Sequence, residues 1–282
     1  MNPAHVTRVY AQWFRVRLRS TISWTLGLAA IVAVTAAFYP SLEGVFDDVE
    51  EGGGLSSLLG LSGDIDPSSP LGFIWTNLYA NVVPWVLMAF GIALGGAAIA
   101  GDEERGTLEY LLSKPVRRGE VLVARFAGMI SILAIAAVVS GVALLASAPL
   151  FDLTTAMTAT APDGSTTTNP GIDAGNVAAG TFAALAVGVG TGSTAFLLGA
   201  VLGRHGLAVG IASGFAIAGY ILYTLSNVTG SLDALTWISP WRWYVEDAMF
   251  INGLDWDVAL PFVLAAVCLA VGWWSFLRRD LR

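Results

Sequence analysis

The side chains that usually do covalent or metal chemistry are scarce in this chain. It has two histidines and one cysteine, too few for an ordinary closed zinc site, and it contains no HExxH sequence. Ser193 and His205 are the one conceivable nucleophile and base pair, but twelve residues of helix would separate them by about 18 Å. We therefore expect no catalytic residue, no metal site and no enzyme activity in this chain.

Nucleotide binding by the chain itself is also not expected. The sequence has no GxxxxGK[ST] pattern, and its only lysine, Lys114, does not follow a glycine-rich loop. A secondary transporter or proton pump usually places an ionisable group inside the membrane, yet Arg125 is the only such residue within the long apolar stretches of the chain. The energy for any transport must therefore come from another protein, or the protein is passive.

The most informative stretch is 101–120, with the sequence GDEERGTLEYLLSKPVRRGE. Residues 105–114 suit a short helix that Pro115 ends, and the spacing places Leu108, Leu111 and Leu112 on one face. Acidic residues near its start and basic residues near its end match the helix dipole. Such a helix is suited to docking in a polar-rimmed groove of another protein. The alternative, which holds for most charge runs of this kind, is a solvated loop.

Six long apolar stretches indicate an all-α integral membrane protein. Each is near the roughly 20 residues that a bilayer requires. Hydrophobic residues make up 55% of the chain and charged residues 12%, unlike a soluble domain. The predicted spans are 21–38, 73–100, 121–148, 177–202, 207–225 and 258–276.

The charges predict the orientation of these spans. Thirteen of the fourteen Lys and Arg residues fall in segments on one side, and Arg242 alone falls opposite. By the positive-inside rule that side is the cytoplasm, and an even number of spans places both termini there. The three outer segments contain fifteen of the twenty-one acidic residues, so the sequence pI of 4.7 reflects the outer surface. It gives no indication of a nucleic-acid partner.

Two segments outside the spans have interfacial character. In residues 1–20, apolar side chains including Trp13 fall on one helical face and arginines including Arg15 on the other, which predicts an amphipathic helix in the headgroup layer. Residues 229–257 are crowded with Trp, Tyr and Phe, which predicts short helices lying on or dipping into the outer leaflet.

Glycines at four-residue spacing predict close helix packing. Gly91 and Gly95 form one such pair, and Gly206, Gly210 and Gly214 form a second series. Small residues on one face allow helix backbones to approach each other closely within lipid. The several glycines of residues 188–203 indicate the same, or a flexible helix that lines a transport route.

Residues 103–120 resemble the cytoplasmic loop of type 2 ABC exporter permeases, the ABC-2 type family. That loop has an acidic pair, Gly-Thr-Leu-Glu, a leucine pair, Ser, and then Pro-Val with basic residues, and it lies between spans two and three, as here. The N-terminal amphipathic helix, the six spans and the outer segment 238–244 also resemble the family.

The resemblance implies that this loop is a coupling helix, which inserts into a groove of a separate ATP-binding subunit. The residues that would form it are Glu103, Glu104, Arg105, Thr107, Leu108, Glu109, Leu111, Leu112, Lys114, Pro115, Arg117 and Arg118. It also implies two copies of the ABC ATPase, with ATP and Mg²⁺ bound there and no cofactor in this chain. A second permease subunit is expected, either the same chain or a related one, in the cytoplasmic membrane of a prokaryote.

The sequence identifies the transported substrate only by class. With so few charges in the spans, the cargo should be apolar or amphipathic, such as a drug, a lipid or a peptide. The polar residues that could reach a route are Asn77, Asn81, Thr191, Ser193, Thr194, Tyr220 and Tyr223. Each could equally form a hydrogen bond between helices. Two alternatives remain open: a passive channel or uncoupled carrier, and a permease of this family that serves envelope metalloenzyme assembly or lipid translocation.

Overall fold

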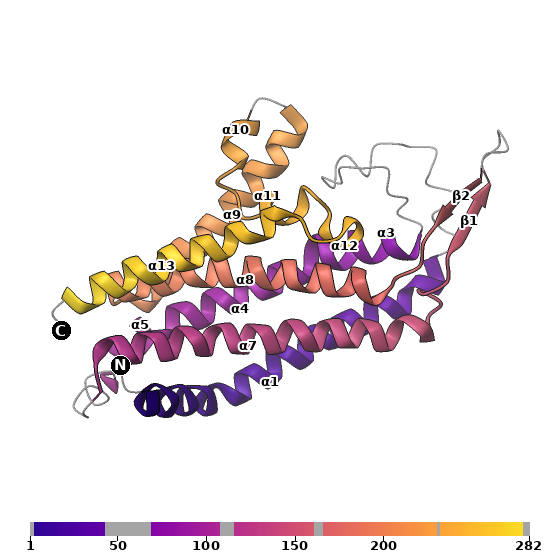
Figure 1. Cartoon of the computed structure of the whole chain (residues 1–282). Helices are drawn as coiled ribbons and strands as arrows, with labels where there is room; N and C mark the ends of the chain where they lie inside the picture. The colour runs from indigo at the N-terminus through magenta and orange to yellow at the C-terminus, as the bar shows by residue number, and fades with distance from the viewer. Residues whose placement is uncertain (1–2, 43–68, 108–115, 161–165, 230–231, 279–282) are drawn as a thin grey trace.

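The structure, a computed structural model, describes residues 3–42, 69–107, 116–160, 166–229 and 232–278. Within these residues six helices are long and apolar enough to cross a membrane (Figure 1). They span Pro3–Ser41, Pro70–Ala98, Arg118–Leu150, Ala174–Leu202, His205–Thr229 and Trp256–Arg278. The prediction of an all-α membrane protein with six spans is confirmed.

The first helix, α1, runs without interruption from Pro3 to Leu42. The sequence suggested an interfacial helix followed by a separate span, but the two are continuous. Between Pro3 and Gly27 there is neither proline nor glycine, so no residue breaks the hydrogen-bond ladder. The amphipathic pattern of the first part is present, because Val9 and Trp13 are buried and Arg15 is exposed.

The second span contains a π-helical segment. It is composed of α3 (Pro70–Ile74), the π-helix η2 (Trp75–Val82) and α4 (Val83–Ala98), and the short α5 (Ala100–Glu104) follows it. In η2 the Val83 N–H donates to the Leu78 carbonyl, five residues back. The next donor in this pattern would be Pro84, which has no N–H, so the Tyr79 carbonyl lacks its helical partner.

A hydroxyl group from the other half of the chain takes that place. Tyr244 donates to the Tyr79 carbonyl at 2.5 Å, and both side chains are buried. Tyr244 lies in α11 (Arg242–Val245), one of four short helical segments in the region 232–258. The others are α10 (Asp233–Thr236), α12 (Met249–Asn252) and the 3₁₀ helix η4 (Trp256–Val258).

The aromatic residues of this region divide into two groups. Trp241 is buried against Trp85 of α4, Phe250 is buried against Tyr79 of η2, and Tyr244 is buried as well. In contrast, Trp237 and Trp256 are exposed. Short helices are therefore present, as the sequence indicates, but many of their rings pack inside the protein rather than facing lipid.

The third and fourth spans are joined at one end by a β-hairpin that the sequence did not suggest. Helix α7 covers Arg118–Ser147 and continues as the 3₁₀ helix η3 (Ala148–Leu150). Strands β1 (Met157–Thr160) and β2 (Thr166–Asn169) pair antiparallel. Threonine, which is frequent in both strands, favours β structure because of its branched Cβ.

Helix α8 (Ala174–Leu202) packs against most of the other spans. It contacts α4, α7, α9 (His205–Thr229), α13 (Ala259–Arg278) and α12. Its start is capped by Asp173, which exchanges hydrogen bonds with Asn176, and it ends at Gly203 in the left-handed conformation with φ of 64°.

Glycines permit the closest of these contacts. A Cβ added at Gly91 would overlap the Gly188 carbonyl, and one added at Gly95 would overlap the Gly192 carbonyl. The predicted packing face on the second span is thus confirmed, and α8 supplies its partner glycines. For the α9 series the prediction is wrong among the described residues of one chain, because none of them has an atom within 4 Å of a Cβ added at Gly206, Gly210 or Gly214.

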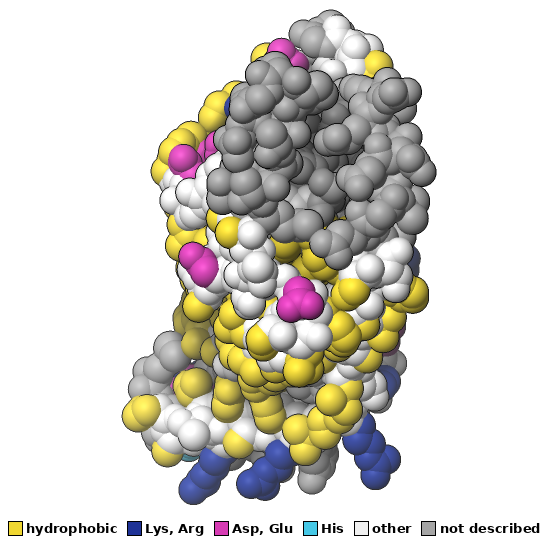
Figure 2. Space-filling view, turned by 90° about the vertical axis from the view of Figure 1, so that its right-hand side faces the viewer, with side chains coloured by type: hydrophobic (Ala, Val, Ile, Leu, Met, Phe, Trp, Pro, Cys, Tyr) yellow, Lys and Arg dark blue, Asp and Glu magenta, His cyan; other side chains and the backbone are white. Residues whose placement is uncertain are grey.

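The two ends of the bundle differ in charge. We call the end that holds the start of α1, α5, the start of α7 and the end of α13 the basic end; both termini lie there in Figure 1. The acidic end holds the hairpin and α10–α12. Figure 2 looks onto the acidic end and shows Asp and Glu side chains across it, while arginine side chains appear at the lower margin of the picture.

Candidate coupling site at the basic end

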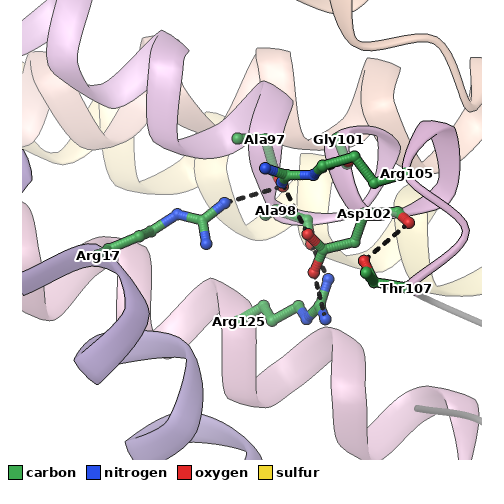
Figure 3. A network of polar contacts seen from close by, with 8 residues as sticks. All are labelled: Arg17, Ala97, Ala98, Gly101, Asp102, Arg105, Thr107 and Arg125. Atoms are coloured by element: carbon green, nitrogen blue, oxygen red, sulfur yellow. Dashed lines mark hydrogen bonds and ion pairs between the residues drawn. The ribbon is translucent and has the colours of Figure 1, made fainter. Parts of the chain in front are cut away.

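An ion pair connects α5 to α7. The Asp102 carboxylate lies 2.6 Å from the Arg125 guanidinium and 2.8 Å from that of Arg105 (Figure 3). Only 5% of the Arg125 side chain and 16% of the Asp102 side chain are exposed. Charged groups in such surroundings are stable only when paired, so this contact holds α5 and α7 together.

Two arginines also cap the end of α4. Arg17 of α1 donates to the Ala97 carbonyl at 3.0 Å, and Arg125 donates to the Ala98 carbonyl. The last carbonyls of a helix have no partner within it, and cations there interact favourably with its dipole. Helices α1 and α7 are therefore both bound to the point where α4 gives way to α5.

The chain turns sharply after α5. Arg105 donates from Nε to the Gly101 carbonyl at 2.7 Å, Gly106 has a φ of 68°, and the Thr107 hydroxyl donates to the Asp102 carbonyl at 3.1 Å. Positive φ is easily adopted only by glycine, so Gly106 separates α5 from the next part of the chain. Glu103 and Glu104 thus belong to α5, ahead of the turn.

Much of the predicted coupling helix lies outside the described residues. These positions are Leu108, Glu109, Leu111, Leu112, Lys114 and Pro115, and their leucine stripe stays a prediction. On the far side of this gap, Arg117 precedes α7 and its N–H donates to Glu120 at 3.2 Å. Arg118 is the first residue of α7.

A second contact connects α5 to α9. The Glu104 carboxylate accepts a hydrogen bond of 2.8 Å from the backbone N–H of His205, the first residue of α9. A carboxylate at a helix N-terminus satisfies a free N–H and interacts favourably with the dipole. The short helix α5 is therefore joined by polar contacts to α7 and α9, and it also packs against α8.

The candidate route residues mostly hydrogen-bond within their own helices. Thr191, Ser193 and Thr194 donate to the carbonyls of Val187, Val189 and Thr191, at 2.9, 2.6 and 2.7 Å. Asn77 and Asn81 donate to Phe73 and Thr76, at 3.0 and 2.9 Å. Tyr220 packs edge-on against Trp85 and Trp241, and Tyr223 is buried. None of these seven residues lines the cavity at the basic end or the apolar cavity beside Trp24 and Val86.

The roles of Asp102, Arg17 and His205 were not predicted from the sequence. A signal was present for the first of them. A lone arginine inside an otherwise uncharged span requires a partner, and Asp102 lies in the adjacent loop. Nothing in the sequence pairs Arg17 with α4, or Glu104 with His205, because those contacts depend on how the helices cross.

Six apolar helices whose basic end presents a short charged segment define a polytopic membrane protein. The sequence model of the family described as ABC-2 family transporter protein matches residues 8–281. The chain therefore belongs to this family and is a transmembrane permease subunit of an ABC transporter. Such subunits reside in the lipid bilayer and associate with an ABC ATPase. No curated protein matches the chain in sequence.

Proposed function

We propose that the chain is the permease of an ATP-driven exporter. It moves an apolar or amphipathic substrate, such as a drug, a lipid or a peptide, across the cytoplasmic membrane of a prokaryote. Both termini and the basic end face the cytoplasm, in accord with the positive-inside rule. A separate ATPase binds residues 103–118, and ATP and Mg²⁺ are bound in that partner.

The position of α5 supports this proposal. It directly precedes residues 108–115, for which the sequence predicts a leucine stripe. It contacts α7 through Asp102 and Arg125, and α9 through Glu104 and His205. A displacement of the segment by the ATPase is therefore passed to two spans at once. Ionic contacts of this kind can shift the arrangement of rigid helices, and the permease itself then needs no catalytic step.

Two copies of the permease are required in this scheme, because two ATPase subunits close together on ATP. The exposed face of α9 supports pairing with a second copy. Gly206, Gly210 and Gly214 form a small-residue stripe at four-residue spacing, and no other described part of the chain lies against it. Such stripes allow two helices to approach closely in lipid. The stripe begins one residue after His205, so α5 contacts the helix that would form the dimer interface.

The docking step is tested by the double substitution Leu111→Asp and Leu112→Asp in the complex with the ATPase. We expect the ATPase no longer to copurify, while the permease still inserts in the membrane. Leu235→Asp is the matched control, since Leu235 is an exposed leucine at the acidic end. An ATPase that stays bound to the double variant, or ATP hydrolysis by the purified permease alone, would refute the proposal.

The export step is tested in proteoliposomes that contain the complex. A fluorescent lipid or an apolar dye should be moved only when ATP is supplied on the side of the ATPase. Movement by the permease without its ATPase would instead identify a passive channel or uncoupled carrier.

A further inference from the structure

A cavity of about 580 Å³ lies at the basic end, between α1, the junction of α4 with α5, and α7. One face of α1 forms one wall of the cavity, and Trp13 and Arg17 lie on successive turns of that face. The other walls carry the ion pair of Asp102 with Arg125. The full lining is Val9, Gln12, Trp13, Val16, Arg17, Ser20, Ala97, Asp102, Arg105, Thr107 and Arg125.

The charged groups of the cavity are unequal in number. Three guanidinium groups face it, from Arg17, Arg105 and Arg125, against the single carboxylate of Asp102. Glu103 and Glu104 are near in sequence but do not line it, and Glu104 accepts its hydrogen bond from His205. Among the described residues, two positive charges in the lining thus lack a carboxylate there, which favours an anionic occupant.

Two buried donors in the lining add an independent observation. Trp13 Nε1 and Arg125 Nε have no hydrogen-bond partner within the described part of the chain, and both residues are 4% exposed. Leaving a buried N–H unpaired is costly, and both groups can only donate. Trp13 is held in place because Gly128 of α7 leaves room for its ring, which a Cβ would touch at 2.7 Å. An acceptor with several oxygens would satisfy these donors.

The cavity is also partly apolar, and part of its edge is exposed. Val9, Trp13 and Val16 form its apolar wall, and Val16 is 74% exposed at the edge. The Arg17 guanidinium lies 4.3 Å from the centre of the Trp13 ring, which keeps the cation beside that wall. The cavity therefore suits a molecule with an anionic group and an apolar chain.

We propose that this cavity binds the headgroup phosphate of an anionic phospholipid from the leaflet at the basic end. Arg17 and Trp13 Nε1 donate to the phosphate oxygens, and the glycerol and first acyl carbons lie along Val9 and Val16. Bidentate donation is the usual way in which guanidinium groups bind phosphate. A zwitterionic headgroup is disfavoured, since its cation would meet the same arginines. The site does not depend on the direction of transport or on the cargo.

The experiment uses the purified full-length permease in an uncharged detergent. Dihexanoyl phosphatidylglycerol, dihexanoyl phosphatidylcholine and inorganic phosphate are titrated separately, and binding is followed by the rise in melting temperature and by native mass spectrometry. Trp13→Phe removes the indole donor and keeps an aromatic ring, and Arg17→Gln removes one charge. The matched control is Arg15→Gln, an exposed residue of the same helix that does not line the cavity.

We expect phosphatidylglycerol alone to stabilise the wild type. The affinity for phosphatidylglycerol should be about tenfold weaker in Arg17→Gln, which loses a charge-assisted hydrogen bond. It should be several-fold weaker in Trp13→Phe, which loses a neutral hydrogen bond. Arg15→Gln should bind like the wild type. Equal stabilisation by phosphatidylcholine, an effect of inorganic phosphate as large as that of the lipid, or an equal loss in Arg15→Gln would each overturn the proposal. If Arg17→Gln does not fold, Trp13→Phe decides alone.

Discussion

The side chains of Asp102 and Arg125 meet at 2.6 Å where α5 and α7 cross. Arg125 also donates to the end of α4, so one buried cation joins three helices at the basic end of the bundle. Ionisable residues at membrane depth are costly unless paired, and this pairing explains how the third span tolerates one.

Removing the carboxylate of this pair should destabilise the protein strongly. In Asp102→Asn the buried Arg125 keeps its charge without a counter-ion, which costs about 3–5 kcal/mol. Melting in detergent should show a large fall in midpoint for this variant. The double variant Asp102→Asn with Arg125→Met should recover part of the loss, because no buried charge remains.

The control for this pair is Asp152→Asn, at an exposed position with a φ of 55° that asparagine also accepts. It should melt like the wild type. An unchanged melting temperature in Asp102→Asn would show that the pair contributes nothing.

The contact of Glu104 with α9 should affect coupling more than stability. Glu104→Ala removes an exposed cap, which costs about 1 kcal/mol. The ATPase should still copurify, but substrate moved per ATP hydrolysed should fall in proteoliposomes. Glu104→Gln retains an oxygen acceptor and should show a smaller loss. Unchanged transport per ATP in Glu104→Ala would contradict a role for this contact.

The sequence predicts those parts of the fold that depend on hydrophobicity and charge. The six apolar stretches are sufficient to predict the six spans. The uneven distribution of Lys and Arg is sufficient to predict which connecting segments lie at the same end of the bundle. The π-helix could not be predicted, because it depends on Pro84 together with a hydroxyl from Tyr244, far along the chain. Contacts of this kind follow from how helices cross, which no local pattern encodes.

The sequence likewise predicts only part of the candidate site. The motif in residues 103–118 identifies the segment and the family, but not which of its side chains contact other spans. The polar route residues were ambiguous because a threonine or serine in a helix can donate to its own backbone. Thr191 and Ser193 do so.

The contact between α4 and α8 should depend on Gly95. A methyl group there would overlap the backbone carbonyl of Gly192, and backbone cannot move aside as a flexible side chain can. Gly95→Ala should therefore lower the free energy of unfolding by about 1–3 kcal/mol. In Gly210→Ala the added methyl meets open space, so folding should be unaffected or favoured by up to about 1 kcal/mol. Equal effects of both substitutions on the melting temperature would refute this distinction.

A bulkier residue on the α9 stripe should separate the permease copies without unfolding them. In Gly210→Ile the side chain projects where a second helix would pack. We expect the melting temperature of the single chain to be retained and chemical cross-linking of pairs in native membranes to be lost. Val142→Ala, at an exposed position of α7, is a control that should leave pairing intact. Undiminished cross-linking in Gly210→Ile would place the interface elsewhere.

The hydrogen bond from Tyr244 to the Tyr79 carbonyl should be measurable at neutral pH. Because Pro84 cannot supply the missing N–H, Tyr244→Phe leaves a buried carbonyl unpaired, at a cost of about 1–3 kcal/mol. Tyr220→Phe alters a partly exposed tyrosine and should cost far less.

The same residue should make the protein sensitive to alkali. Burial raises the pKa of Tyr244 well above its ordinary value, and the nearby Tyr79 adds to this. The folded state therefore retains a proton that the unfolded chain releases near pH 10. Its contribution to stability is complete below that pH and declines as the pH rises toward the folded pKa. Tyr244→Phe cannot ionise, so its melting temperature should fall less steeply above pH 10 than that of Tyr220→Phe. Parallel curves for the two variants would show that Tyr244 ionises as freely in the folded protein as in the unfolded chain.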